Sequence, residues 1–306
     1  MFVTTSQDFN YRPWRIIALI FFPLWLIWTV FSLGVRIEHF VVAFALLSLF
    51  WINPRTAKVA AILFPMLLGA IIYDNARLLI GLRGEIHVAN LYMAELRWFG
   101  INTAGGRQIL TEFFQQHHCP LLDLICGIGM LGYIALTVPF GLFISFKDWA
   151  RAWRLVWAFV LLNAMGVATF LLYPAAPPWY VEKYGLGPAI LDALPSAAGA
   201  ARIDQLLGVP IFANFYTRAF DVFGAMPSLH CAYPMLLVCA TLRMGYRYSI
   251  LPIVLTVLVC FSVIYFGHHY VLDVIAGILY AVAAYLMVLA IQKLWAHAWA
   301  KRAKSG

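Results

Sequence analysis

The segment SVIYFGHHYVLDVIAG at 262–277 places two histidines and an aspartate at the boundary between two apolar runs. His269 and Asp273 are four residues apart, so on a helix they share one face. The carboxylate can accept a hydrogen bond from one ring nitrogen and leave the other nitrogen free as a nucleophile. His268 would pair with Leu272, so the register favours His269 as the reactive histidine. The alternatives are a structural His–Asp pair and a zinc site, which would need further ligands.

A second group of polar residues lies in FGAMPSLHCAYP at 223–234. Gly224 and Pro227 interrupt the chain before an apolar helix, and Ser228 is expected to cap that helix. Free N–H groups of its first turn suit an anion such as phosphate. His230 lies in the same turn, where it can give a proton to a leaving oxygen. The alternatives are that Ser228 is only a cap and that His230 is a hydrogen-bonded core residue.

A third group combines IIYDNARLL at 71–79 with FLLYPAAPPWYVEK at 170–183. Asp74 and Arg77 are three residues apart on one predicted helix face, where they form an ion pair or grip a polar headgroup. The prolines of the second segment end a helix and fix a rigid corner. Trp179 follows them, at the depth of a membrane interface. An ordinary helix end with aromatic anchors is the alternative.

The composition indicates what must hold these groups in place. Hydrophobic residues make up 64% of the 306 positions and charged residues only 11%, which excludes an ordinary soluble enzyme, a disordered chain and a nucleic-acid-binding module. The N-terminus shows no cleavable signal, so the first apolar run is expected to be retained. We predict an all-α, polytopic membrane helix bundle. The eight expected spans are 15–34, 38–53, 57–80, 120–146, 153–173, 228–244, 249–267 and 269–292.

The distribution of charge predicts the orientation in the membrane. With both termini in the cytoplasm, the cytoplasmic segments hold 13 of the 21 basic residues and only two of the 13 acidic residues. All three polar groups then lie on the extracytoplasmic side, and such convergence favours a single site. The outer connections at 88–118 and 188–207 have helical spacing and are expected to form short interfacial helices.

These polar residues also match a family pattern. PSLH at 227–230 and SVIYFGHHYVLD at 262–273 resemble the second and third signatures of the type 2 phosphatidic acid phosphatase superfamily. The contexts FGAMPSLH and YPAAPPW resemble one branch, the inositol phosphorylceramide synthase-like (aureobasidin-resistance-like) inositolphosphotransferases. The resemblance implies a six-helix phosphatase-type core within 57–292, after N-terminal membrane helices in 1–56 and before a basic cytoplasmic tail at 293–306.

The resemblance also implies a role for each residue of the motifs. His269 would attack a phosphorus atom and become a phosphohistidine, and Asp273 would orient it. His230 would protonate the leaving oxygen and later activate the acceptor hydroxyl. The backbone at Ser228 and Leu229 would cradle phosphate oxygens. This scheme needs no metal ion and no other cofactor, since fixed donors stabilise the charge.

The sequence departs from the superfamily pattern in two of its signatures. Val263 replaces the arginine of the third signature, and the lysine and arginine of the first signature are absent, with Tyr173 at the expected arginine position. Other side chains must then bind the phosphate. The candidates are Arg77, Lys183, Arg218 and His268.

Three functions remain open at this point. The resemblance favours a lipid phosphotransferase that moves a phosphoryl-linked headgroup, such as inositol phosphate, between lipids. It would take a lipid phosphate or phosphoinositide as donor and a lipid hydroxyl as acceptor, and no nucleic acid. The first alternative is a lipid phosphate phosphatase that uses water as acceptor. The second is a membrane transporter or scaffold, which would give the His–Asp pair no purpose.

Overall fold

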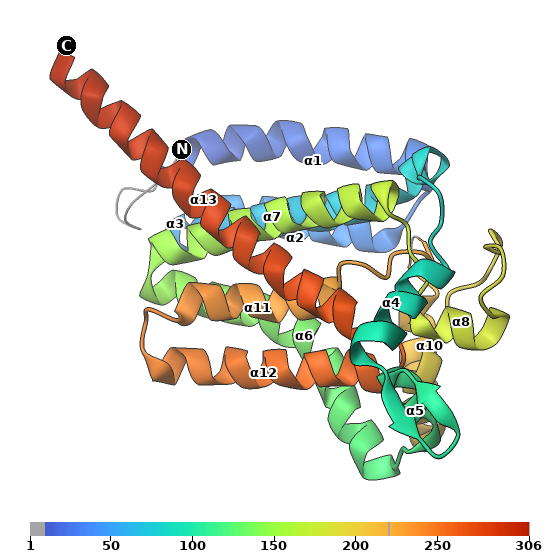
Figure 1. Ribbon diagram of the computed structural model, residues 1–306. Coiled ribbons are helices and arrows are strands. Elements are labelled where there is room, and N and C mark those ends of the chain that lie inside the picture. Colours follow the sequence, from blue (N-terminus) through green and yellow to red (C-terminus); the bar gives the residue numbers. More distant parts are fainter. Residues whose placement is uncertain (1–9, 220, 306) are drawn as a thin grey trace.

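The computed structural model describes residues 10–219 and 221–305, and it is an almost entirely helical bundle (Figure 1). All eight predicted spans are helices, which confirms the all-α membrane bundle. The long helices are α1 (Arg12–Leu33), α2 (Ile37–Ile52), α3 (Pro54–Asn75) with its 3-10 continuation η1 (Ala76–Leu82), α6 (Pro120–Lys147), α7 (Trp149–Leu172), α11 (Leu229–Thr241), α12 (Tyr246–Tyr265) and α13 (Val271–Ser305).

Five of these helices, within the described residues, are long and apolar enough to cross a membrane: α1, α3 with η1, α7, α12 and α13. Helix α6 is bent by 46° and makes a sixth span if its two halves are counted as one. Helices α2 and α11 are apolar but have only 16 and 13 residues. Their shortness follows from local chemistry. Asn53 ends α2 and caps α3 through the N–H groups of Arg55 and Thr56.

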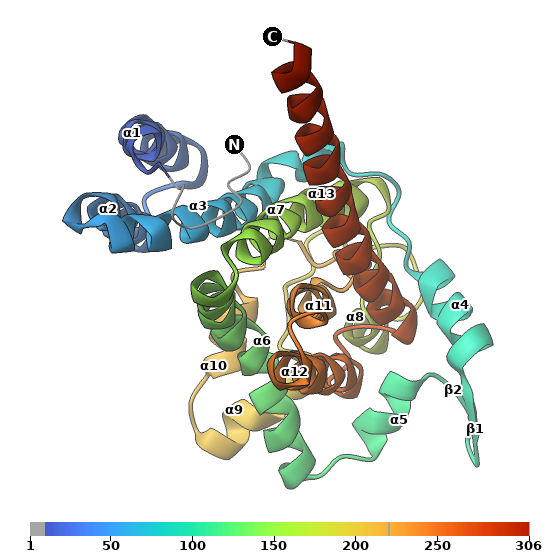
Figure 2. The same ribbon diagram turned by 90° about the vertical axis from the view of Figure 1, so that its left-hand side faces the viewer.

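Helix α11 lies in the middle of the bundle. Viewed end-on, it is surrounded by α6, α7, α12 and α13, and it packs on all four (Figure 2). Helix α1 packs mainly on α2, and α2 mainly on α3, at the side of the bundle. The predicted division into 1–56, 57–292 and 293–306 stays a prediction, and α13 runs without a break across its last boundary. A central position for α11 buries the residues of its first turn.

Glycine permits the close approach of α13 to the start of α11. A Cβ at Gly277 would overlap the carbonyl oxygen of Ser228. With glycine there, the N–H of Ser228 reaches the backbone carbonyl oxygen of Asp273 at 3.0 Å. The two helices are therefore fixed against each other where the predicted site residues lie.

Short elements cover the end of the bundle where α11 and α13 begin (Figure 1). The segment 88–118 forms the two predicted short helices, with a hairpin between them that turns at Ala104 and Gly105 and enters β2 at Gly106, where φ is +112°. The segment 188–207 is helical only in its last ten residues, Ala198–Leu207. The elements are α4 (Ala89–Phe99), β1 (Ile101–Thr103), β2 (Gly106–Gln108), α5 (Leu110–Gln116), α8 (Pro178–Tyr184), η2 (Ala198–Ala200), α9 (Ala201–Leu207) and α10 (Ile211–Tyr216).

Candidate active site

Backbone hydrogen bonds bring the polar segments together at this end of the bundle. Ala175 lies between two parallel neighbours, His87 and Gly224, in isolated β-bridges. Its N–H donates to the carbonyl of Phe223 at 2.8 Å. The N–H of Trp179 donates to the carbonyl of Gly267 at 3.0 Å. The segments 170–183, 223–234 and 262–277, which are far apart in the sequence, therefore meet as predicted.

The two predicted catalytic histidines are in direct contact. Nδ1 of His230 lies 2.9 Å from Nε2 of His269, and the ring centroids are 5.0 Å apart. His230 comes from the first turn of α11, whereas His269 lies in the turn between α12 and α13. His269 is 5% exposed, whereas His230 is half-buried. Two imidazoles at this distance can act on one phosphorus atom.

A backbone carbonyl, rather than the predicted carboxylate, lies closest to the second nitrogen of His269. Nδ1 is 2.8 Å from the carbonyl oxygen of Ala225 and 3.4 Å from Oδ2 of Asp273. Helix α13 begins at Val271, so His269 precedes the helix and does not share a helical face with Asp273. Because a carbonyl oxygen only accepts, Nδ1 must carry the proton. Nε2 is then left with its lone pair.

The protonation state of the pair follows from this tautomer. Burial lowers the pKa of His269 to about 4, so its ring is neutral near pH 7 and Nε2 holds a free lone pair. The donor in the contact between the histidines is therefore Nδ1 of His230. The other nitrogen of His230 lies 3.5 Å from the hydroxyl of Tyr216. In the resting site, the Nδ1 proton of His230 therefore points at the lone pair on Nε2 of His269, where an electrophilic phosphorus atom would bind.

Asp273 acts on the turn as well as on the histidine. Its Oδ2 accepts the N–H of Tyr270 at 2.9 Å and lies within ion-pair distance of His269. Among the described residues, Oδ1 is buried and has no hydrogen-bond partner. An imidazolium formed during reaction would be stabilised by this carboxylate. Orientation of His269 is accordingly shared between Asp273 and Ala225.

A cavity of about 90 Å³ opens beside the histidines. Its walls include Trp179, Tyr216, His230, His268 and His269. It is smaller than the pockets of about 300–1,000 Å³ that enclose whole small molecules, so it suits a phosphoryl group rather than a complete lipid. His268 stacks on Tyr216 with ring centroids 4.3 Å apart, and its buried Nε2 has no hydrogen-bond partner among the described residues. When the His268 ring is protonated, this nitrogen can donate to a phosphate oxygen.

The residues expected to cradle phosphate at the start of α11 lie close to the cavity but are already engaged. Ser228 is fully buried, and its hydroxyl lies 3.5 Å from Sγ of Cys231 instead of capping the helix as predicted. Its N–H donates to Asp273, as described above. The side chain of Leu229 packs against Gly166. A phosphate cradle would have to use N–H groups after Ser228.

The predicted lysine and arginine candidates lie outside the cavity wall. No lysine or arginine is among the described residues that line it. Lys183 and Arg218 are exposed, and Arg218 pairs with Glu38 at 3.6 Å. Arg77 pairs with Asp74 at 2.6 Å, so the simpler of the two sequence interpretations, an ion pair, is present. Whether these side chains bind substrate stays a prediction.

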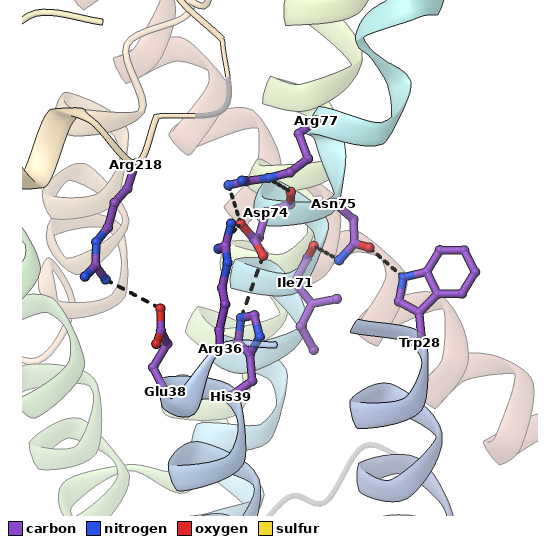
Figure 3. A network of polar contacts seen from close by, with 9 residues as sticks. All are labelled: Trp28, Arg36, Glu38, His39, Ile71, Asp74, Asn75, Arg77 and Arg218. Atoms are coloured by element: carbon purple, nitrogen blue, oxygen red, sulfur yellow. Dashed lines mark hydrogen bonds and ion pairs between the residues drawn. The ribbon is translucent and has the colours of Figure 1, made fainter. Parts of the chain in front are cut away.

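The Asp74 carboxylate belongs to a larger network between α2 and α3 (Figure 3). It also receives Arg36 at 3.3 Å and lies 3.8 Å from Nε2 of His39. Two arginines thus share one carboxylate, which leaves an excess of positive charge close to the cavity-lining Tyr73. Sequence reasoning missed Arg36, because only folding brings it to Asp74, 38 residues away.

Glu95 was also missed, and it holds the helix that carries Asp273. This side chain of α4 is 1% exposed. Its two oxygens accept the N–H groups of Val271 at 2.9 Å and Leu272 at 3.1 Å. The carboxylates of Glu95 and Asp273 together accept the N–H groups of three consecutive residues, 270–272, at the start of α13. Glu95 does not line the cavity, so it is a positioning residue.

We expect Glu95→Gln to lower kcat about tenfold while the KM for the donor lipid changes little. The amide keeps one acceptor oxygen and loses the charge, so the turn that presents His269 loosens, and small displacements of reacting groups are costly. Steady-state kinetics in lipid vesicles measure both constants. Glu95→Ala should be more severe than Glu95→Gln.

Glu85→Gln is the matched control, because Glu85 is exposed. It should behave like the unsubstituted protein. If Glu95→Gln lowered the unfolding temperature but left kcat unchanged, Glu95 would have only a structural role. A change confined to KM would point to substrate contact instead.

Comparison with known proteins supports a common ancestry for this arrangement. A family model described as the PAP2 superfamily matches residues 98–287. The chain is 33% identical over 273 residues to a phosphoinositol dihydroceramide synthase of Bacteroides thetaiotaomicron, covering 88% of this chain and 89% of that protein. It is 33% identical to the catalytic subunit of inositol phosphorylceramide synthase of Schizosaccharomyces pombe, over 54% of this chain and 40% of the fungal one. The corresponding subunit of Saccharomyces cerevisiae is 38% identical over 38% of this chain and 29% of its own length. No solved structure matches the chain significantly.

Proposed function

The chain belongs to the PAP2 superfamily, and on this premise we propose that it transfers a phosphoryl-linked headgroup, such as inositol phosphate, from a phosphoinositide donor to the hydroxyl of a ceramide-like lipid. The observation that carries the proposal is the contact between Nδ1 of His230 and Nε2 of His269 beside a small buried cavity. The names of the relatives supply the headgroup and the acceptor.

The first half of the reaction forms a phosphohistidine. The phosphoryl group of the donor enters the cavity and displaces the contact between the two histidines. The lone pair on Nε2 of His269 attacks phosphorus, and the bond from phosphorus to the oxygen of the departing lipid breaks. His230, doubly protonated once the anionic phosphoryl group is bound, gives its Nδ1 proton to that oxygen and remains as a neutral imidazole with a proton on Nε2. Asp273 and the carbonyl of Ala225 stabilise the charged ring of His269 through its Nδ1 proton.

The second half returns the enzyme to its starting state. The acceptor hydroxyl gives its proton to Nδ1 of His230, and its oxygen attacks phosphorus. The bond between phosphorus and Nε2 of His269 breaks, and the new lipid leaves. Atoms and charge balance over the two steps without a metal ion or a nucleotide.

An apolar cavity next to the histidines supports a lipid substrate. It has a volume of about 330 Å³, and its walls include Met130, Tyr133, Phe212 and Phe215. Tyr216 lines both this cavity and the one at the histidines, and the ring of Tyr133 lies 4.9 Å from that of His230. An acyl or sphingoid chain in the apolar cavity would therefore place its polar end at the reacting atoms.

We expect purified protein in vesicles that contain labelled phosphoinositide and ceramide to form a labelled inositol-phosphate-bearing ceramide. Omission of ceramide should leave only slow release of inositol phosphate to water. A short-chain ceramide should be a poorer acceptor, since it fills less of the apolar cavity. If inositol phosphate or free phosphate were the only product with ceramide present, water would be the acceptor and the chain would be a phosphatase.

We further propose that the histidine end of the bundle faces away from the cytoplasm, with both termini in the cytoplasm. The excess of basic residues at the opposite end supports this orientation. The vesicle assay tests it with orthovanadate, which mimics five-coordinate phosphorus. In sealed vesicles of known orientation, vanadate should inhibit only from the extracytoplasmic face, and inhibition only from the other face would reverse the topology.

A further inference from the structure

A second cavity lies at the other end of the bundle, between α7, α11 and α13. Its volume is about 310 Å³. Four basic side chains line it: Arg151 and Arg154 from α7, Arg243 from the end of α11, and Lys293 from α13. Its basic residue Arg243 is separated from His230 by nearly the whole of α11, which is about 18 Å along the helix axis at 1.5 Å per residue. This cavity is therefore not part of the active site.

The positive charge of this cavity is only partly neutralised. No aspartate or glutamate is among the described residues that line it. Arg151 pairs with Asp148 at 2.6 Å. Nε of Arg154 is buried and has no hydrogen-bond partner among the described residues. A buried guanidinium nitrogen without an acceptor is costly, and an anionic ligand would supply one.

Apart from Tyr285, the rest of the cavity wall is apolar and reaches the outer surface of the bundle. It is formed by Met235, Leu242, Val282, Leu286 and Leu289. Leu242 is 58% exposed and Leu286 is 56% exposed, so this wall continues into the surface that faces the lipid hydrocarbon. An occupant must therefore combine an anionic head with an apolar chain.

We propose that this cavity binds an anionic phospholipid of the leaflet opposite the active site, with its phosphate among the four basic side chains and an acyl chain along the leucines. A basic pocket between membrane helices, open toward hydrocarbon, fits such a lipid better than it fits a soluble anion. The lipid is a bound component of the bundle, because the reacting histidines lie too far away to act on it. By bridging α7, α11 and α13, it would stabilise the helix that carries His230.

The test measures lipid binding by full-length protein in nanodiscs, independently of catalysis. Protein is moved from phosphatidylcholine nanodiscs into nanodiscs that also contain phosphatidylglycerol, and retained lipid is counted by native mass spectrometry. We expect selective retention of phosphatidylglycerol and a higher unfolding temperature. The double variant Arg154→Gln, Lys293→Gln should bind it about 30-fold more weakly, as expected for the loss of two membrane-facing cations.

The matched control removes two exposed basic residues of the same region that do not line the cavity, Arg247→Gln with Lys301→Gln. It should retain phosphatidylglycerol like the unsubstituted protein. Equal losses in both double variants would reduce the effect to general surface charge and overturn the site. An equal thermal shift from inorganic phosphate in phosphatidylcholine nanodiscs would identify a free anion instead of a lipid. Arg243→Gln alone, at an exposed position, repeats the test if the first variant folds poorly.

Discussion

Substitution His269→Ala is expected to abolish headgroup transfer, with a fall in kcat of about four orders of magnitude or more. The alanine removes the lone pair that would attack phosphorus, and no other described side chain offers one at the same place. His230 cannot replace it and also serve as the acid that protonates the departing oxygen. The vesicle assay with labelled phosphoinositide measures the loss. The acid-labile phosphorylated form of the protein should disappear with it.

The matched control is His297→Ala, on the exposed C-terminal part of α13. It also removes one imidazole but lies far along the helix from the cavity, so it should leave transfer unchanged. Both variants need an unaltered unfolding transition in detergent for the comparison to hold. Should a well-folded His269→Ala protein keep its transfer activity, the phosphohistidine route is wrong, and a transporter or scaffold becomes the better account of this bundle.

Local sequence features predicted the helices and the chain breaks around the site, because both depend mainly on nearby residues. The apolar runs predicted the helices. Gly224, Pro227 and Gly267 marked the interruptions of the chain that precede His230 and His269. The topology argument predicted that the three polar segments would share one end of the bundle, and their backbones are in fact hydrogen-bonded there. The interfacial helices were predicted from their period, although the hairpin between α4 and α5 was not.

Partners that only the tertiary fold supplies could not be predicted. The carbonyl of Ala225 selects the tautomer of His269 from 44 residues away, and a backbone carbonyl carries no sequence signal. Glu95 reaches the start of α13 across 176 residues, and within its own segment it resembles any polar residue of an amphipathic helix. The i,i+4 rule placed His269 on a helix that begins two residues later. Hydrophobic periodicity predicts which face of a helix is buried. It does not predict which distant group will contact that face.

Among the described residues, few charged side chains line the cavity that must receive the negatively charged phosphoryl group. A phosphoryl group must enter a cavity whose described walls hold histidines, a tryptophan and Asp221, whose carboxylate is bound by Arg83 at 3.0 Å. Positive charge close to phosphorus therefore comes mainly from His230, protonated once the phosphoryl group is bound, and from N–H groups. Transfer of the His230 proton to the departing oxygen then neutralises the negative charge that develops on this oxygen as the bond breaks.

Substitution His230→Gln is expected to lower the rate with the natural donor about 10²–10⁴-fold, the range for loss of a positioned acid–base group. The departing lipid leaves as a poorly stabilised alkoxide unless Nδ1 of His230 protonates it. A donor whose leaving group is a nitrophenolate needs no such proton. Its rate of phosphohistidine formation should therefore fall far less, and rapid-quench measurement of the first turnover compares the two donors.

Comparison of the two donors distinguishes the role of His269 from that of His230, whatever the size of each effect. His269→Ala should be inactive with both donors, whereas His230→Gln should lose the natural donor and still become phosphorylated on His269 by the activated one. That phosphorylated form should persist, because the acceptor hydroxyl then lacks a base to take its proton. Equal losses with both donors would instead mean that His230 holds substrate or His269 in place, through the 2.9 Å contact, without transferring a proton.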